Sequence, residues 1–270
     1  MSPDWILALT VPLALALGVV CGEFCGRRGP RAASAFVLVM LLPLIAKALS
    51  RFLQETEVSA FGVGIYPVLR PWWAFPFAFA VLSCAAATRS KPSERRGLRL
   101  LVIGLSLLVL QRVHATVTAD PQRLLGRVDA NGICLQTSPI SCGAAAAVML
   151  LDQQGIRRTE ARMAELCSTN ALTGTDEFCV QRGLVKVLEE ECREWSVDYS
   201  EPSLEELEAP AMVPVRLSFF VDHWVVVESI DGEASSLVIL DPIEGRVKST
   251  LADFEARWRS RVIRIVKREG

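Results

Sequence analysis

The chain has 270 residues, 51% of them hydrophobic, a mean hydropathy of +0.34 and a formal net charge of −1. Residues 1–112 carry 12 Lys or Arg and 5 Asp or Glu, whereas residues 113–270 carry 17 and 25. The acidic second half holds no basic cluster, which argues against a nucleic-acid partner. The apolar, basic first half is untypical of a soluble domain and indicates a membrane region.

About four membrane helices are predicted, at residues 5–22, 32–50, 71–88 and 98–117. The first three contain uncharged runs close to the ~20 residues that a spanning helix needs. The fourth run, Leu100–Gln111, is shorter, so it spans only if its flanking arginines reach the interface or if the helix continues to Val117. Residues 1–4 have no basic region, which favours an uncleaved first helix over a signal peptide.

Basic residues gather in the loops that follow the first and third of these helices: Arg27, Arg28 and Arg31, then Arg89, Lys91, Arg95, Arg96 and Arg99. The positive-inside rule places both loops in the cytoplasm. With four spans, the C-terminal half then lies on the extracytoplasmic side of the membrane. If the fourth helix does not span, that half stays inside.

Residues 113–131 are predicted to form a polar connector and residues 132–270 one α+β domain. Three helices come first, from Cys142 to about Gly155, at Thr159–Cys167 and at Asp176–Glu191, with Thr159 and Thr175 as N-caps. β-Branched runs follow at Val213–Leu217, His223–Ile230, Ser236–Leu240 and Val262–Val266. Helices followed by antiparallel strands indicate the α+β class.

Four residues have the chemistry of a thiol active site. Cys142 begins a helix, where unsatisfied N–H groups and a nearby imidazolium would stabilise the thiolate that attacks a carbonyl. His223, one of only two histidines, is the predicted general base. Asp241 would orient the histidine ring. The side-chain amide of Gln136, with the backbone N–H of Cys142, would stabilise the oxyanion.

A hairpin is expected to bring the base and the carboxylate together. If its turn centres on Asp231–Gly232, Asp241 lies within one residue of the position opposite His223. Each residue taken alone also fits a structural role: a cysteine at a helix start is usually a small buried side chain, and Asp-Pro after a strand is commonly a turn. Their joint presence in this order favours the active site.

The segment Gln136-Thr-Ser-Pro-Ile-Ser-Cys142-Gly-Ala-Ala resembles the active-site segment of C39-type papain-like cysteine peptidases, which process bacteriocin leader peptides. His223-Trp-Val-Val-Val and Val238-Ile-Leu-Asp241-Pro are similar to that family's histidine and aspartate segments, as are Leu172-Thr-Gly-Thr, Phe254 and Trp258 to other parts of it. The resemblance covers about residues 130–270. It implies a papain-like fold and cleavage after small residues, often Gly-Gly. Many members are fused to an ATP-binding transporter, but this chain has no GxxxxGKS or GxxxxGKT phosphate loop.

We therefore expect a membrane-anchored cysteine peptidase that cleaves small or extended peptides without a cofactor or metal. Its expected partners are a peptide substrate, the lipid bilayer and a separate exporter. Two alternatives stay open: a catalytically silent papain-like module that binds peptides, and an acyl transferase that uses the same thiol. Four further cysteines, Cys134, Cys167, Cys179 and Cys192, either form two disulfides in one of three pairings or remain buried thiols.

Overall fold

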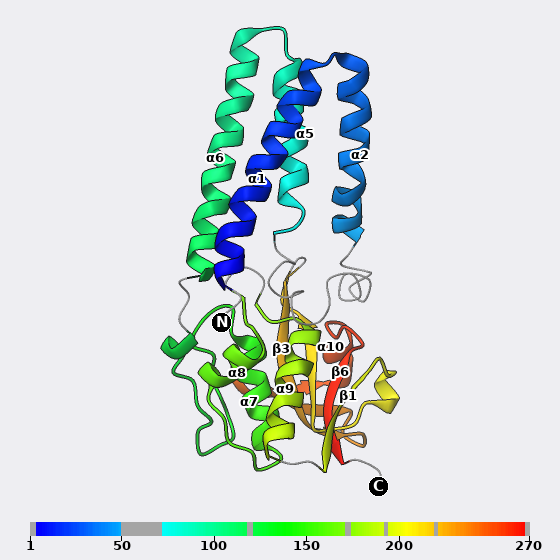
Figure 1. Ribbon diagram of the computed structural model, residues 1–270. Helices are drawn as coiled ribbons and strands as arrows, with labels where there is room; N and C mark the ends of the chain where they lie inside the picture. Colours follow the sequence, from blue (N-terminus) through cyan, green and yellow to red (C-terminus); the bar gives the residue numbers. More distant parts are fainter. Residues whose placement is uncertain are drawn as a thin grey trace. The chain divides into compact units, whose positions relative to one another are not determined.

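The computed structural model describes residues 4–49, 72–117, 121–170, 174–191, 194–218 and 221–267. The chain divides into two compact units, Met1–Ala119 and Asp120–Gly270. The described part of the first unit is helical, and the second combines helices with one sheet (Figure 1). This division follows the change from apolar, basic sequence to acidic sequence.

Four helices make up the described part of the first unit: α1 (Asp4–Arg27), α2 (Pro30–Leu49), α5 (Phe75–Thr88) and α6 (Pro92–Val117). Among the described residues, three helical stretches are long and apolar enough to cross a membrane: Leu7–Arg27, Pro30–Ala48 and Pro92–Ala115. These helices indicate that the N-terminal unit associates with a membrane.

The last two helices of this unit differ in length from the prediction. α6 begins at Pro92 rather than at residue 98 and has 26 residues; it continues to Val117, which is one of the two conditions under which the sequence predicts that this helix spans. The predicted helix at 71–88 appears as α5, which has only 14 residues; position 71 lies outside the described residues. Pro76 lies in the first turn of α5, where its missing N–H leaves no hydrogen bond unmade.

Three glycines of α1 allow α5 to pack closely against it. A Cβ atom at Gly18 would overlap the carbonyl oxygen of Pro76, and one at Gly22 would overlap that of Ala80. Gly26 meets α5 in the same way, one turn further along. This spacing of small residues lets membrane helices approach backbone to backbone.

Ion pairs join the C-terminal end of α1 to the N-terminal end of α6. Arg99 donates to both carboxylate oxygens of Glu23, at 2.9 and 3.0 Å, and Arg27 donates to the same carboxylate at 2.9 Å. The two loops that carry the basic residues therefore lie at the same end of this helical unit (Figure 1).

The second unit begins with its helices, as predicted. The 3₁₀ turn Pro121–Arg123 precedes α7 (Cys142–Asp152), α8 (Glu160–Leu166) and α9 (Glu177–Glu191). Thr159 caps α8 by accepting a hydrogen bond from the backbone N–H of Arg162 at 3.2 Å, as predicted. α9 is capped differently: the Asp176 carboxylate, not Thr175, accepts from the N–H of Cys179 at 2.9 Å.

Six strands form one antiparallel sheet: β1 (Trp195–Ser200), β2 (Ala211–Arg216), β3 (Asp222–Asp231), β4 (Ser236–Asp241), β5 (Gly245–Thr250) and β6 (Val262–Lys267). Their order is β1-β6-β2-β3-β4-β5. The predicted runs correspond to β2, β3, β4 and β6. The two edge strands, β1 and β5, were not predicted, because polar residues occupy at least half of the positions in each. Short elements complete the unit: the 3₁₀ turn Leu204–Glu206 and α10 (Leu251–Glu255).

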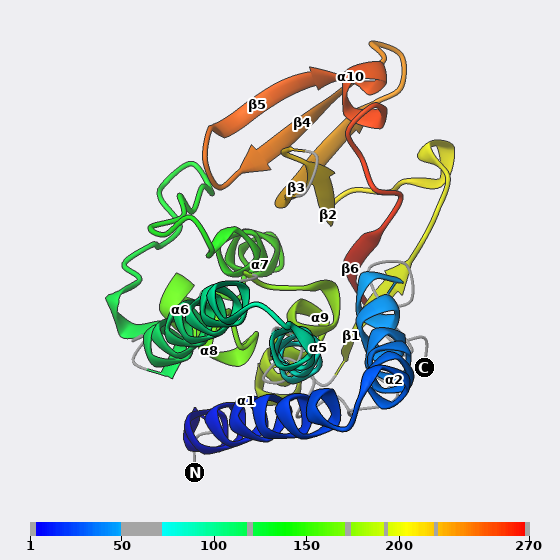
Figure 2. The same cartoon turned by 90° about the horizontal axis from the view of Figure 1, so that it is seen from above.

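Alternation along β3 divides the core of this unit in two. Trp224 and Val226 pack with α7, whose residues 142–151 are all buried. Val225 and Val227 belong to a second cluster with Phe254 of α10. Figure 2 shows β3 and β4 between α7 and α10. A helix that is apolar all round needs burial on every side, which α8, α9 and the sheet provide for α7. This burial fixes the position of Cys142 at the N-terminus of α7.

Candidate active site

Cys142 is the first residue of α7 and is only 9% exposed. A tight turn precedes it, in which the Ser141 hydroxyl donates to the Ser138 carbonyl at 2.8 Å. The next residue must be glycine, because a Cβ atom at Gly143 would lie 2.7 Å from the Cβ of Thr175. The sulfur therefore sits at a helix end whose first N–H groups have no partner within the helix.

His223 lies near the start of β3 and is 3% exposed. Its Nε2 is 2.8 Å from Oδ1 of Asp241, and its side chain also hydrogen-bonds with the Cys142 thiol. Burial alone lowers the pKa of His223, but the hydrogen bonds and charges of Asp241 and Cys142 raise it to about 9. The imidazole is therefore protonated at neutral pH and can pair with a thiolate.

Asp241 ends β4 and is held by its own loop. Its Oδ1 accepts backbone N–H groups from Ile243 at 2.7 Å and Glu244 at 3.3 Å, besides the histidine. Burial raises the pKa of this carboxyl, but the His223 hydrogen bond and these N–H groups outweigh it, so the pKa is lowered. The carboxylate is thus ionised and oriented towards the base.

The hairpin register predicted for these two strands is wrong. Asp231 pairs with Ser236, so the turn spans the four residues 232–235 instead of centring on Asp231–Gly232, and a bulge follows between Val227 and Ser229. Continuing the pairing of Val226 with Leu240 sets Asp241 opposite residue 225 rather than residue 223. The carboxylate reaches His223 along the diagonal of the ladder, a distance that two side chains of this length can bridge.

Gln136 lies beside the same loop. Its backbone N–H donates to the Pro242 carbonyl at 2.8 Å, and its side-chain Nε2 donates to the Ser138 carbonyl at 2.9 Å. Its Oε1 is buried and has no hydrogen-bond partner among the described residues. The amide nitrogen keeps a second hydrogen, since a carboxamide donates twice.

Sequence reasoning missed two interactions around the site. The indole N–H of Trp224 donates to the Thr175 carbonyl at 2.8 Å, and the Thr175 and Thr169 hydroxyls are 2.8 Å apart. These bonds hold Thr175 against Gly143 and occupy the hydroxyl that was predicted to cap α9. The sequence signal for the first interaction is Trp224, which directly follows the candidate base His223 and carries an N–H group that needs a partner when it is buried. Of the segment Leu172-Thr-Gly-Thr, residues 172 and 173 lie outside the described residues.

The other cysteines of this unit do not form the two disulfides considered. Cys134, Cys167 and Cys179 are buried free thiols, and Cys192 lies outside the described residues. Burial raises the pKa of Cys134 and of Cys167 to about 12, and it raises the pKa of Cys179 as well. They are protonated and unreactive at neutral pH. Among the described residues no group of His, Cys, Asp or Glu is arranged to hold a metal.

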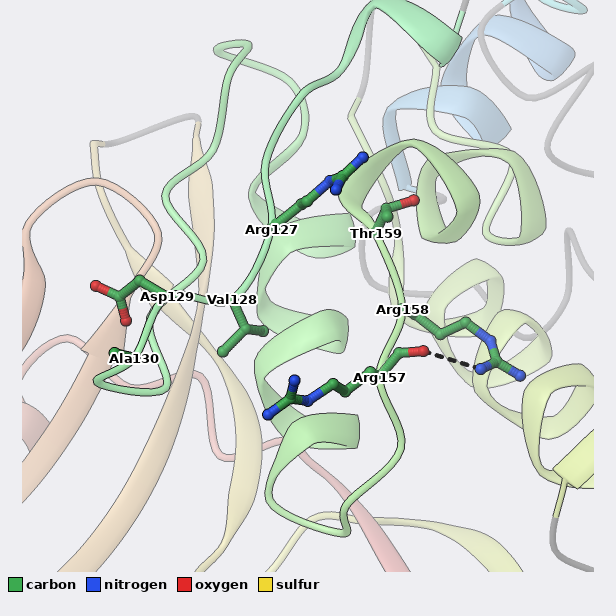
Figure 3. A pocket seen from close by; sticks show the side chains of 7 residues that line it. All are labelled: Arg127, Val128, Asp129, Ala130, Arg157, Arg158 and Thr159. Atoms are coloured by element: carbon green, nitrogen blue, oxygen red, sulfur yellow. Dashed lines mark hydrogen bonds between the residues drawn. The ribbon is translucent and has the colours of Figure 1, made fainter.

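A separate hollow contains none of the four candidate residues. It is lined by Arg127, Val128, Asp129, Ala130, Arg157, Arg158 and Thr159. Its arginines point apart in Figure 3, and Arg158 donates to the Arg157 carbonyl at 2.9 Å and to Glu191 at 2.6 Å. The cations do not converge on one point, so the hollow lacks the geometry of an anion site.

Helices that precede an antiparallel sheet, with a cysteine at a helix start and a His–Asp pair on adjacent strands, define the papain-like class of cysteine peptidase fold. A family model described as the peptidase C39 family matches residues 131–270. The chain belongs to this family. The resemblance inferred from the sequence and the α+β, papain-like fold are confirmed.

Solved structures similar to the chain are peptidase domains of transporters. The domain of Streptococcus ComA, a bifunctional ABC transporter of a quorum-sensing pathway, is 18% identical, with a TM-score of 0.43, covering 50% of this chain and 96% of that one. A double glycine motif protease from an AMS/PCAT transporter, solved with its leader peptide, is 18% identical, with a TM-score of 0.44 and coverages of 53% and 95%. A C39-like domain of a toxin secretion ATP-binding protein from Vibrio parahaemolyticus is 13% identical, with a TM-score of 0.36 and coverages of 49% and 100%. The comparison with curated proteins returned no match.

Proposed function

We propose that this chain is a membrane-anchored cysteine peptidase that hydrolyses bonds in small or extended peptides. The observation that carries the proposal is the buried His223, which contacts both Cys142 and Asp241 and has its pKa raised to about 9. A structural histidine would need neither a thiol at a helix N-terminus nor an ionised carboxylate. A histidine placed between a thiol and a carboxylate instead fits the base of a thiol nucleophile.

We propose one role for each group. The Cys142 thiolate attacks the substrate carbonyl, and the oxyanion that forms is stabilised by the Cys142 backbone N–H and the second Gln136 amide hydrogen. His223 then gives its proton to the leaving amine, which leaves an acyl thioester on the sulfur. In the second half, neutral His223 takes a proton from water as the water oxygen attacks the thioester carbonyl. The C–S bond then breaks, which releases the carboxylic acid and restores the Cys142 thiolate beside the protonated His223.

The proposed substrates follow from membership of the C39 family. We propose cleavage after Gly-Gly or other small residues, as the resemblance implies, and a separate exporter that acts on the product. The chain itself supplies the membrane anchor through α1, α2 and α6. Its substrate would therefore be processed next to a bilayer.

The basic residues indicate on which side this happens. The arginines that end α1 and begin α6 lie at the same end of the helical unit, where Arg27 and Arg99 share Glu23. The positive-inside rule assigns that end to the cytoplasm. α6 runs from there to Val117, where the peptidase unit follows in the chain. We therefore place the peptidase unit on the extracytoplasmic side.

Replacing the proposed nucleophile tests the function. Cys142→Ala in the full-length chain should abolish hydrolysis of peptides that carry Gly-Gly, because no other described thiol has this environment. Cys25→Ala, in the helical unit, is the matched control and should leave hydrolysis unchanged. Undiminished cleavage by the Cys142→Ala protein would refute the proposal. Peptide binding without turnover by the unaltered protein would favour a silent binding module, and transfer of the acyl group to an amine would favour an acyl transferase.

A further inference from the structure

Glu160 is a fully buried carboxylate in the peptidase unit, with no exposed surface. It is the first residue of α8 and reaches towards the segment that contains Gln136. Its Oε1 accepts the backbone N–H of Thr137 at 2.9 Å. Its Oε2 accepts the Thr137 hydroxyl at 2.6 Å and the backbone N–H of Gly126 at 2.9 Å.

All three partners of Glu160 act as donors. The two backbone N–H groups cannot accept, and the Thr137 hydroxyl already accepts from the N–H of Leu125 at 3.2 Å, so its proton points to the carboxylate. The two carboxylate oxygens of Glu160 satisfy all three, because both can accept hydrogen bonds. A glutamine of the same size would turn an N–H₂ group towards one of these donors and would leave at least one bond unmade.

The position of Glu160 is itself fixed by its neighbours. Arg127 and Thr159 form an antiparallel bridge, and Figure 3 shows these two residues on neighbouring segments. The backbone N–H of Glu160 donates to the Gly126 carbonyl at 3.0 Å, which complements the bond from the Gly126 N–H to its side chain. Gly126 must be glycine, because a Cβ atom there would overlap Oε2. The carboxylate thus has one orientation available.

This carboxylate holds one side of Gln136. The peptide N–H after Gln136, that of Thr137, is bound by Glu160, and the peptide N–H before it, that of Gln136 itself, is bound by the Pro242 carbonyl. Both peptide groups that flank the Gln136 Cα are therefore fixed, one by α8 and one by the loop that carries Asp241. The direction of the Gln136 side chain depends on both.

We propose that Glu160 is a positioning residue for the oxyanion donor: it fixes the Gln136–Thr137 backbone so that the Gln136 amide meets the substrate oxyanion. The proposal rests on the proposed function, since an oxyanion forms only during thiol attack. The hydrogen bonds of Glu160 go to Gly126 and Thr137, not to the sulfur or the imidazole, so Glu160 would act on the stabilisation of the transition state rather than on the nucleophile.

The test compares a reaction that needs the oxyanion donor with one that does not. In the full-length chain in detergent micelles, Glu160→Gln should lower kcat/KM for a Gly-Gly peptide amide by about 10- to 100-fold, mainly through kcat. A Gly-Gly peptide aldehyde, whose adduct with the thiol carries the same oxygen, should bind more weakly by a similar factor. Alkylation of Cys142 by iodoacetamide, which forms no oxyanion, should change by less than about twofold.

A second pair of variants tests the same hydrogen bond at an exposed residue, because replacing the buried Glu160 could itself disturb folding. Thr137 is exposed, and Thr137→Val removes its hydroxyl bonds to Glu160 and to the Leu125 N–H but keeps the backbone bond to Glu160, whereas Thr137→Ser keeps all three. The valine variant should show the same split between hydrolysis and alkylation, to a smaller degree, and the serine variant should restore the activity. Hydrogen exchange at the Gln136 and Thr137 amides should quicken in Glu160→Gln while exchange in α7 stays slow.

The outcomes separate this inference from the function on which it rests. If the unaltered chain neither cleaves the peptide nor binds the aldehyde, the proposed function fails, and unchanged exchange at Thr137 in Glu160→Gln would overturn the positioning role as well. If the unaltered chain is active and Glu160→Gln keeps its kcat/KM, only the positioning role is overturned. Parallel losses of hydrolysis and alkylation would also overturn it, because they would show a general structural effect.

Discussion

At the residue scale, the proposed mechanism depends on the charge state of His223. Its pKa is raised to about 9 because the hydrogen bonds and charges of Asp241 and Cys142 outweigh the opposing effect of burial. In the proposed mechanism, the imidazolium lies beside the sulfur, and its proton is ready for the leaving amine. The same contact therefore serves both halves of the reaction.

Activity should fall as the pH rises through about 9, because His223 then loses the proton that it must donate. Asp241→Asn should move this alkaline limb to lower pH, since asparagine can still accept from Nε2 but carries no charge. Profiles of kcat/KM against pH would measure the shift, and Asp222→Asn, beside the histidine in β3, is the control. An unchanged limb in Asp241→Asn would contradict the assignment.

The same shift has a consequence for stability. The folded pKa of His223 lies above its ordinary value of 6.5, so its interactions stabilise the fold fully below about pH 6.5 and lose that effect as the pH rises through about 9. The free energy of unfolding should therefore decline over this range in the unaltered protein.

The four candidate residues could be recognised in the sequence from the chemistry of their side chains. The residues that hold them in position could not be recognised in this way. Glu160 appears in the sequence as an ordinary charged residue at a helix start, and nothing local indicates that its carboxylate is fully buried. Its partners, Gly126 and Thr137, are 34 and 23 positions away. Such hydrogen bonds depend on the contact between segments that are distant in the sequence. The hydrophobic periodicity of one segment does not predict this contact.

At the scale of elements, the entry to α7 depends on how closely the Thr175 loop approaches it. Gly143 leaves room for Thr175, which the Trp224 indole holds through its carbonyl. The register of the β3–β4 hairpin likewise depends on local backbone geometry. Its two strands were recognised from β-branched residues, but the four-residue turn and the bulge that set the pairing carry no such signal.

Gly143→Ala should destabilise the peptidase unit by about 1–3 kcal/mol, because the new methyl group would overfill a packed site 2.7 Å from the Thr175 Cβ. It should also reduce hydrolysis, since the strain acts next to the nucleophile. Gly232→Ala, in the β3–β4 turn where a Cβ meets nothing within 4 Å, is the control. Denaturant unfolding would compare them, and equal stability of the two variants would argue against the packing role.

At the scale of the whole molecule, one chain contains a helical unit whose surface suits lipid and a peptidase unit whose surface suits water. The helical unit exposes leucines such as Leu13, Leu38 and Leu107 at 71%, 66% and 62%, as a surface that meets lipid would. The close contact of α5 with α1 and the Glu23 ion pairs bring the basic loops to one end. Hydropathy indicated the membrane helices, whereas the shortness of α5 came only with the structure.

Alkaline phosphatase fused after residue 267 should be active, and the same enzyme fused at residue 90, between α5 and α6, should be inactive, because it folds only outside the cytoplasm. Full-length reporter expression checked by immunoblotting is the control for both fusions. The reverse pattern would place the peptidase unit in the cytoplasm and would contradict the proposed orientation.

The most direct test of the central claim is to map the adduct of a Gly-Gly peptide acyloxymethyl ketone on the full-length chain by mass spectrometry. If Cys142 and His223 act as one catalytic unit, the unaltered protein should carry a single adduct, on Cys142, and His223→Ala should slow its formation by about 100-fold or more. Equal labelling of His223→Ala, or an adduct mainly on another cysteine, would contradict the account.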